Sequence, residues 1–305
     1  NDNVIMPAIN FIASYSMAKQ MGANIYLADV NPETGQMTEK NVLECIKKNK
    51  LKKIKCFISM YLGGSPERNI ELFKLKKKFK CFMIEDACHA LGSYYSYLGK
   101  KFKIGSNKHS DISVFSFHPV KTIATGEGGC VTTNSEKIFN KIKSFCDHGI
   151  NRNDNKHWDY NIKELGFNYR LSDLNCALGL SQLNKLKKFL NYRYKIRKNY
   201  VKLLHNSKIT FSKISECNYS ANHLMIIFIK FSFIKSNKDK FMKFMKNNGI
   251  FCQQHYKPIY RYKFYNLKNN EIKNFLGSEK YYSSSVSIPI FYGMNPIIQK
   301  KIINK

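Results

Sequence analysis

Short apolar runs alternate with amphipathic stretches along the first part of the chain. The runs at 4–6, 25–30, 54–61, 80–86, 112–115 and 129–133 have the length and composition of buried strands. Helical spacing of apolar residues marks the stretches 10–21, 38–48, 67–79 and 134–145. In the third stretch Leu72, Leu75 and Phe79 share one side, whereas Ile70 and Phe73 lie off it. The alternation predicts a mainly parallel sheet with right-handed crossovers.

The pattern changes near residue 185. A long helical region is expected over 171–205, with a break near Lys188. After it, we expect a strand at 223–230, a helix at 239–248 and a strand at 250–253, whereas 148–160 is expected to be a loop. The sequence therefore predicts an α/β protein with a large domain at 1–185 and a smaller α/β domain at 186–305.

Polar residues follow two of the predicted strands at the edge where parallel strands end. Asp86 closes one strand and is followed by His89, and Lys121 lies in a loop after another strand, with Gly126 and Gly128 beyond it. Ligands of open α/β sheets bind beyond the carboxyl ends of the strands, so these polar side chains are expected to face one crevice. Taken singly, a loop lysine is usually a solvated charge, and an aspartate after a strand is usually a helix N-cap.

The composition narrows the classes of function. The net charge of +30 raises the question of nucleic-acid binding, but the lysines are scattered over predicted exposed helix faces, so no such partner is expected. A positive field would still attract a substrate that carries a diphosphate. Nine cysteines without a CxxC pair predict reduced thiols, a cytoplasmic location and no metal site. The longest apolar run, 224–229, is too short to span a membrane.

Five segments resemble, in the same order, the motifs of the DegT/DnrJ/EryC1/StrS sugar aminotransferases. They are Glu85-Asp-Ala-Cys-His-Ala-Leu-Gly92, Ser116-Phe-His-Pro-Val-Lys121, Thr125-Gly-Glu-Gly-Gly129, Gly166-Phe-Asn-Tyr-Arg-Leu-Ser-Asp173 and Gln254-His-Tyr-Lys-Pro258. The joint match is far more specific than any one motif and extends along nearly the whole chain. It implies fold-type I of the pyridoxal phosphate enzymes. Asn1 matches a point inside the family's first domain, so an N-terminal piece is expected to be absent, and the last helix is expected to be shortened.

This resemblance implies pyridoxal 5′-phosphate as the cofactor. Lys121 would bind its aldehyde as a Schiff base and, once displaced, would move a proton on the substrate. Asp86 would pair with the pyridine nitrogen and keep it protonated. The remaining residues expected to bind the cofactor are Ser116 at the phosphate, His89 at the ring hydroxyl, Phe11 stacked on the ring and Asn168 at the phosphate of the neighbouring subunit. The last role implies a homodimer with shared sites.

The same resemblance bears on the substrate. Lys121 favours transamination over the dehydration that relatives with histidine there perform, and His118 and Glu127 match the members that aminate C4. Substrate contacts are expected from His118, His255 and Tyr256. The expected reaction transfers an amino group from L-glutamate to C4 of a UDP-linked 4-keto-6-deoxy hexose of pseudaminic acid biosynthesis. Perosamine or bacillosamine-type substrates stay open, as do a non-catalytic regulatory relative and a basic nucleic-acid-binding protein.

Overall fold

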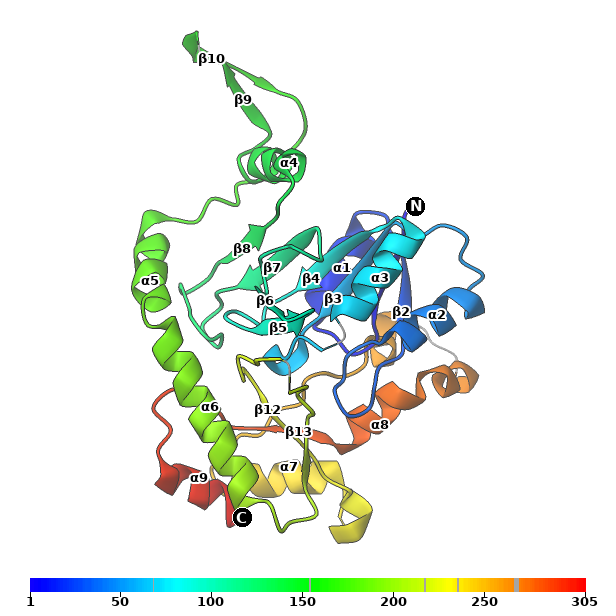
Figure 1. Ribbon diagram of the computed structural model, residues 1–305, viewed down its shortest axis with the longest axis vertical. Coiled ribbons are helices and arrows are strands. Elements are labelled where there is room, and N and C mark those ends of the chain that lie inside the picture. Colours follow the sequence, from blue (N-terminus) through cyan, green and yellow to red (C-terminus); the bar gives the residue numbers. More distant parts are fainter. Residues whose placement is uncertain (68, 154, 217, 235, 266–268) are drawn as a thin grey trace.

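A six-stranded sheet forms the centre of the molecule (Figure 1). The computed structural model describes residues 1–67, 69–153, 155–216, 218–234, 236–265 and 269–305. The strand order is β2 (Asn24–Ala28), β1 (Asn3–Pro7), β3 (Cys56–Met60), β4 (Phe82–Asp86), β7 (Ile112–Ser116) and β8 (Gly129–Thr132). All neighbours pair in parallel except β8, which is antiparallel to β7. The predicted mainly parallel sheet is confirmed.

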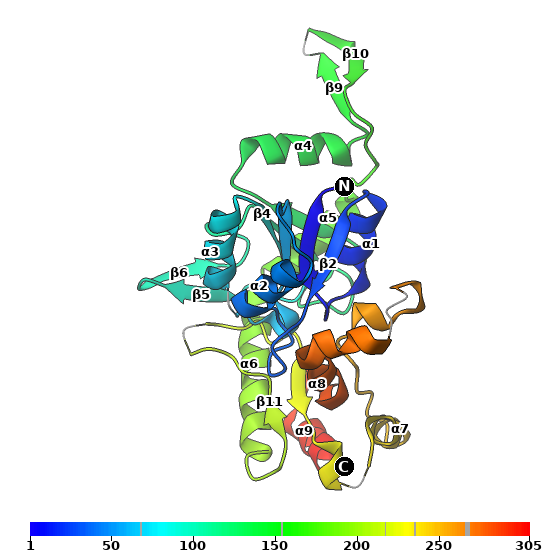
Figure 2. The ribbon, with the colours of Figure 1, turned by 90° about the vertical axis from the view of Figure 1, so that its right-hand side faces the viewer.

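The crossover helices cover both faces of this sheet (Figure 2). They are α1 (Ile12–Gln20), α2 (Glu39–Lys48) and α3 (Asn69–Phe79). Alternation along β1 sends Ile5 into the cluster that holds Val42 of α2 and Leu72 of α3, whereas Val4 faces the opposite cluster, against which Ile12 of α1 packs. Thr38 caps α2 through a capping box with Asn41.

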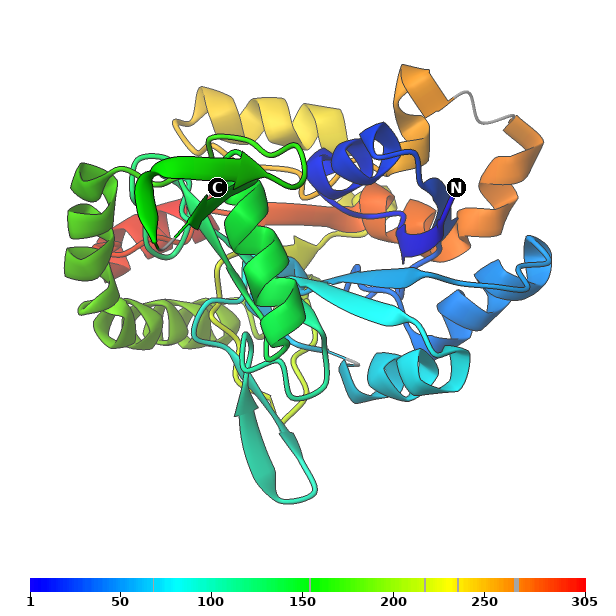
Figure 3. The same ribbon diagram turned by 90° about the horizontal axis from the view of Figure 1, so that it is seen from above.

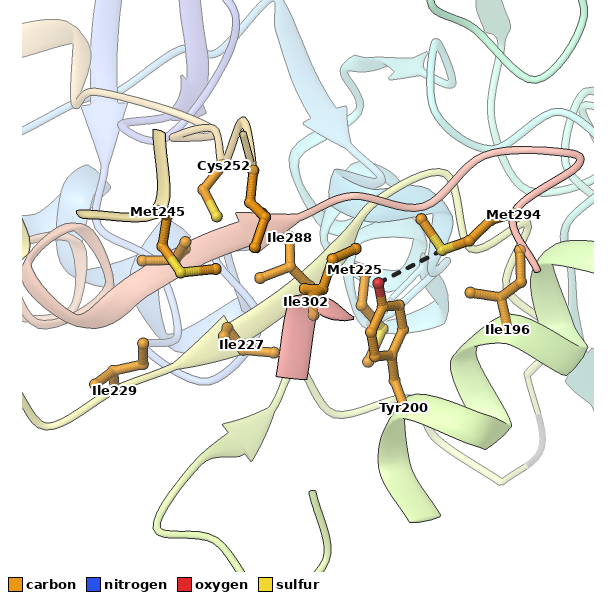
Figure 4. Packing of buried hydrophobic residues seen from close by; sticks show 12 residues of the cluster. Ile196, Tyr200, Met225, Ile227, Ile229, Met245, Cys252, Ile288, Met294 and Ile302 are labelled. Carbon is orange, nitrogen blue, oxygen red and sulfur yellow. Dashed lines mark hydrogen bonds between the residues drawn. The ribbon is translucent and has the colours of Figure 1, made fainter. Parts of the chain in front are cut away.

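The remainder of the chain forms a second, antiparallel sheet with its own core. Two helices, α5 (Asp173–Leu183) and α6 (Leu186–Leu203), lead into the sheet β11 (Thr210–Phe211), β12 (Met225–Phe228) and β13 (Ser285–Ile288). Figure 4 shows its core, where Tyr200 of α6 packs among Met225, Ile288 and Met294. The helices α7 (Lys238–Asn247), α8 (Leu276–Ser284) and α9 (Pro296–Ile303) complete this part. The domain boundary near residue 185 stays a prediction.

Three predictions for individual elements need correction. The helical region breaks at Asn184 and Lys185 rather than near Lys188, because α5 already ends at Leu183. The segment 250–253 is not a strand, since only Gln253 forms a bridge, to Ser287, while Ile250 and Cys252 pack in the core. The predicted loop at 148–160 is largely an antiparallel hairpin of β9 (Ile150–Asn153) and β10 (Lys156–Ile162).

The β9–β10 hairpin extends beyond α4 (Glu136–Cys146), away from the main sheet (Figure 1). A second hairpin, β5 (Tyr94–Tyr97) and β6 (Lys100–Lys103), projects from another side of the body (Figure 3). The 3-10 turns are η1 (Leu62–Gly64), η2 (Phe231–Ile234), η3 (Ile259–Arg261), η4 (Lys263–Tyr265) and η5 (Asn269–Phe275). Within the described ranges, none of the helices has the length and apolarity needed to cross a bilayer.

Candidate active site

Asp86 stands at the carboxyl end of β4 with its carboxylate fixed by two neutral donors. The Ser14 hydroxyl, in the first turn of α1, donates to Oδ2 at 3.0 Å, and the Cys88 amide donates to Oδ1 at 3.2 Å. The side chain is buried, so these bonds decide its orientation. Sequence reasoning missed Ser14, although its place in the first turn of the helix that follows the first strand, at the same edge of the sheet, could have indicated it.

His89 is held between the turn η1 and the C-terminal part of the chain. The Gly63 amide donates to Nδ1 at 3.3 Å, and Nε2 lies 3.1 Å from the hydroxyl oxygen of Tyr256. Burial lowers the pKa of His89 well below its usual value, with nearby His223 and Lys121 adding to the effect. Because the ring is neutral and accepts at Nδ1, its proton lies on Nε2 and is donated to Tyr256. The Tyr256 hydroxyl proton is then available to a ligand.

Lys121 lies in the turn that follows β7 and is partly buried. Its amide donates to the carbonyl oxygen of His118 at 2.9 Å, and the Thr125 amide closes the loop on Phe117 at 2.9 Å. Burial lowers the pKa of the Lys121 amine, while the charges of Cys88 and Asp86 act in the opposite direction. The amine and the Asp86 carboxylate are therefore close enough to interact electrostatically, as the sequence predicted for two residues on neighbouring strands.

Two further histidines approach from the C-terminal part. His255 bonds to the hydroxyl of Ser287 through Nδ1 at 2.9 Å, and burial together with the charge of Lys121 lowers the pKa of His255 to about 4. The ring of His223 lies 4.4 Å from that of His89. Burial, then Lys121, lowers the pKa of His223 well below its usual value. His223 gave no signal in the sequence, because it stands as a single histidine at the start of an apolar run.

Phe11 is the N-cap residue of α1, and Ser116 is the last residue of β7. The Phe11 ring lies 5.7 Å from Tyr256 at 49°, and 53% of the residue is exposed, so an aromatic face is available to a planar ligand. The Ser116 hydroxyl accepts from the His118 amide at 3.3 Å and so closes the turn before Lys121. His118 itself is exposed, with Nε2 3.8 Å from Glu127 Oε1.

Asn168 lies in a different environment from the other predicted cofactor residues. It forms a β-bridge with Asp147, and the flanking amides of Phe167 and Tyr169 donate to the carbonyl oxygens of Phe145 and Cys146 at the end of α4. Its side chain is exposed. The structure thus gathers Lys121, Asp86, His89, His255, Tyr256 and Phe11 at one edge of the sheet, while Asn168 is held at the surface by the end of α4.

The chemistry of this donor set suits one kind of ligand. A buried carboxylate that accepts only from neutral donors can pair with a protonated ring nitrogen. An exposed aromatic face suits a planar ring, and a partly buried amine of lowered pKa suits a covalent bond to an aldehyde. The described side chains include no group of three or more histidine, cysteine or acidic residues placed to hold a metal ion.

Comparison with known proteins agrees with this chemistry. The chain is 36% identical over 293 residues to the UDP-4-amino-4,6-dideoxy-N-acetyl-beta-L-altrosamine transaminase of Campylobacter jejuni, covering 96% of this chain and 75% of the relative. It is 31% identical over 265 residues to the GDP-perosamine synthase of Escherichia coli O157:H7, covering 86% and 69%. The structure of the Helicobacter pylori aminotransferase PseC, described as involved in the biosynthesis of pseudoaminic acid, superposes with a TM-score of 0.88 at 28% identity, covering 99% of this chain and 78% of that one.

Residues 1–305 match the description "DegT/DnrJ/EryC1/StrS aminotransferase family". This match, the relatives above 30% identity and the shared fold together show that the chain belongs to that family and is a pyridoxal-phosphate-dependent sugar aminotransferase.

Proposed function

We propose that this enzyme transfers the amino group of L-glutamate to C4 of a UDP-linked 4-keto-6-deoxy hexose, the reaction expected for pseudaminic acid biosynthesis. The observation that carries the proposal is that Asp86, at the end of β4, and Lys121, in the turn after the neighbouring strand β7, lie close enough for the carboxylate charge to raise the pKa of the amine. Support for the substrate comes from the relative at 36% identity, which is named for a UDP-linked amino sugar. A cytoplasmic location remains a prediction from cysteine usage.

The residues of the pocket fit pyridoxal phosphate. Asp86 is buried, yet its hydrogen bonds come from a hydroxyl and an amide, so its charge is left for Lys121 and for a protonated pyridine nitrogen. Phe11 offers a ring face on which the cofactor would stack, Ser116 would bind the phosphate and His89 would lie at the ring hydroxyl. When bound, the cofactor supplies a ring that accepts electrons from the carbon whose C–H bond is broken.

The chain's own groups would then carry the proton. Lys121 has a lowered pKa because it is partly buried, so its amine is more often neutral near pH 7 than an exposed lysine would be. A neutral amine can accept a proton from the substrate carbon and return it at the neighbouring position. His89 would stay neutral and hold the Tyr256 hydroxyl at 3.1 Å from its Nε2, which leaves that hydroxyl proton for a substrate oxygen. His255 and His118 would contribute further substrate contacts, His118 from the exposed side.

We propose that two copies form a homodimer in which Asn168 reaches the cofactor phosphate of the other copy. Apolar side chains are exposed along the segment that includes Asn168 and along the helix that follows it. They are Leu165, Phe167, Tyr169, Leu174, Leu178, Leu180 and Leu183. A run of exposed apolar residues of this kind is typical of a protein interface.

A substrate panel tests the proposed function. The holoenzyme with glutamate is offered UDP- and GDP-linked 4-keto sugars, and the amino sugar product is identified by mass spectrometry. We expect the UDP-linked 4-keto-6-deoxy hexose to be aminated with the highest kcat/KM. Preference for the GDP-linked 4-keto sugar would favour perosamine formation instead, an alternative supported by the relative at 31% identity. Absence of amination with every sugar would overturn the proposal.

A further inference from the structure

A second cavity, of about 850 Å³, lies between α6, the segment 209–216 that contains β11, and two loops that follow β2 and η1 (Figure 2). Cavities that bind small ligands measure about 300–1,000 Å³, so this one has room for a ligand well above the size of an amino acid. None of the catalytic-site residues described above lines it. Its apolar lining consists of Val201, Leu204, Ile209, Phe211 and Ile214.

Arg197 of α6 brings a positive charge to this cavity. Its Nη2 donates to the Ser212 carbonyl oxygen at 2.8 Å, and its Nη1 lies 3.8 Å from the Met225 sulfur. Burial lowers the pKa of Arg197 to about 10, which still leaves the guanidinium charged at neutral pH. No carboxylate among the described residues forms an ion pair with it. A guanidinium has five N–H donors, so it can also bind a phosphate or a carboxylate.

Glu67 brings a negative charge to the same cavity. The residue is only 5% exposed, and its described partners are neutral. Its Oε1 accepts from the Ser65 hydroxyl at 2.7 Å, the Ser215 amide at 3.0 Å and Asn218 Nδ2 at 3.4 Å, whereas Oε2 accepts from the Ser215 hydroxyl. Because a carboxylate oxygen can accept two hydrogen bonds, Oε2 has capacity for one more donor. A cation that supplied it would compensate a buried charge.

The other charged residues of the cavity do not need a ligand. Lys213 Nζ lies 2.7 Å from Glu33 Oε2, so these two charges compensate each other. His205 and Glu216 are exposed to solvent. In the described part of the chain, the charges of this cavity that lack both a counter-ion and full solvation are therefore one guanidinium and one carboxylate.

These two opposite charges are held near each other. Arg197 is bonded to Ser212 and Glu67 to Ser215, and three residues of chain span at most about 11 Å. A single ligand that carries an anionic group and an ammonium group could therefore reach both. Its uncharged part would lie against the apolar lining.

We propose that this cavity binds an amino nucleotide sugar, with the diphosphate at Arg197, the ammonium at Glu67 and the nucleobase against the apolar side chains. This inference rests on the proposed function, whose product is such a molecule. The product carries an amine on the hexose and a diphosphate on the other side of the ring. The keto substrate has the same diphosphate but no amine, so Glu67 would favour the product over the substrate.

Two probes differ in the group that Glu67 would bind. UDP-glucosamine has a free amine on its hexose, whereas the amine of UDP-N-acetylglucosamine is acetylated and uncharged. Calorimetry with the holoenzyme counts the equivalents of each that bind per chain. We expect two equivalents of UDP-glucosamine, one in the catalytic site and one in the cavity. The second equivalent of UDP-N-acetylglucosamine should bind at least about 10-fold more weakly, the effect of losing one charge-assisted hydrogen bond.

Three variants assign the second equivalent to the cavity. Arg197→Gln and Glu67→Gln each remove one charge and keep a polar side chain, so each should raise the Kd of the second equivalent of UDP-glucosamine by about 10-fold or more. Lys195→Gln is the matched control, because Lys195 is exposed on the same helix and does not line the cavity. It should bind both equivalents as the wild-type protein does. Amide hydrogen exchange locates the ligand, since UDP-glucosamine should slow exchange in the segment 209–216.

Three results would overturn the assignment. They are an equal number of equivalents of the two probes, a second equivalent that both Arg197→Gln and Glu67→Gln still bind tightly, and slowed exchange of 209–216 by glutamate alone, which would give the cavity to an amino acid. If circular dichroism shows that Glu67→Gln does not fold, Arg197→Gln decides together with the exchange data. If the wild-type enzyme aminates no keto sugar, the proposed function fails, yet calorimetry and exchange still show whether the cavity binds UDP-glucosamine.

Discussion

The catalytic site at the end of the main sheet and the β9–β10 hairpin differ in which side chains they bury. The site buries polar groups, whereas the hairpin exposes apolar ones. In the pocket, charged and polar groups are buried: Asp86 accepts from Ser14 and Cys88, and His89 is held between Gly63 and Tyr256. In the hairpin, apolar side chains are exposed, with Tyr160 at 58% and Ile162 at 53%.

The contrast shows which part of the molecule is complete within one chain. The polar groups of the site are oriented by contacts from α1, β4, η1 and the C-terminal part, so the catalytic groups are positioned within a single copy. The hairpin is held by its own strand pairing and by the end of α4, and its apolar surface is left without a cover. Such a surface gains stability only against another one.

The largest effect, on the amination rate, is expected from replacing Lys121 in the catalytic site. Lys121→Arg keeps the charge and should leave the fold intact, but a guanidinium cannot form the covalent bond to the cofactor. We expect amination to fall by at least about 10³-fold, the scale seen when a covalent nucleophile is removed. The rate is measured with saturating substrates, and folding by circular dichroism. Lys52→Arg, at an exposed loop position, is the control and should keep the wild-type rate; ordinary turnover by Lys121→Arg would contradict the assignment.

Replacing the exposed apolar residues of the β9–β10 hairpin tests whether this hairpin contributes to dimer formation. Tyr160→Ser combined with Ile162→Ser removes two exposed apolar side chains just before the segment that we propose joins the two copies, so the dimer dissociation constant should rise by about 10²-fold if the hairpin extends that interface. Sedimentation over a concentration series measures it.

Leu98→Ser is the matched control for this double variant, because Leu98 is 81% exposed at the end of the other hairpin, β5–β6. It should leave the dimer unchanged. Equal dissociation constants in the double variant and the wild-type protein would show that the hairpin does not join two copies.

A smaller effect is expected from loosening the pocket at Ser14. Ser14→Ala removes the hydroxyl that donates to Asp86 at 3.0 Å and leaves the carboxylate less well oriented toward the ring nitrogen. The cofactor Kd, from absorbance titration, should rise by about 10-fold, the worth of one hydrogen bond to a charged group. Ser16→Ala in the same helix is the control. Tight cofactor binding in Ser14→Ala, equal to that of Ser16→Ala, would exclude a role for Ser14.

The smallest effect concerns stability and pH. The folded-state pKa of His255 is lowered from 6.5 to about 4, so below pH 6.5 the unfolded chain binds a proton that the folded chain does not. The free energy of unfolding should therefore be highest above pH 6.5 and should fall towards pH 4, by on the order of 1 kcal/mol from this partly exposed group. Urea unfolding at several pH values measures it. His255→Gln should flatten that slope; a slope identical to that of the wild type would rule His255 out as its source.

Local patterns predicted the main sheet because each strand and helix there has a distinct period. The stripe of Leu72 and Leu75 is an example, since helical spacing acts between neighbours in sequence. The hairpin was missed because the segment 150–162 is rich in asparagine and charge, and becomes a strand pair only through its register, such as Ile162 opposite Ile150. Conversely, Ile250 and Cys252 read as a strand but are buried by side-chain packing without a ladder.

The same difference between local and long-range contacts separates the site residues that the sequence predicted from the contacts that it missed. Lys121 and Asp86 could be named from motifs, because each stands at the end of a strand and strand order brings the ends together. Ser14 reaches Asp86 across 72 residues, and Tyr256 reaches His89 across 167. Hydrogen bonds between residues so far apart in the sequence leave no local sequence pattern from which they could be predicted.

The sequence by itself determined the alternation of strands and helices, the family and the amine and carboxylate of the pocket, because periodicity and short motifs are properties of neighbouring residues. Only the tertiary structure decided how Asp86 is oriented and which nitrogen of His89 carries the proton. These features depend on burial and on hydrogen bonds between distant segments, which exist only once the chain has folded.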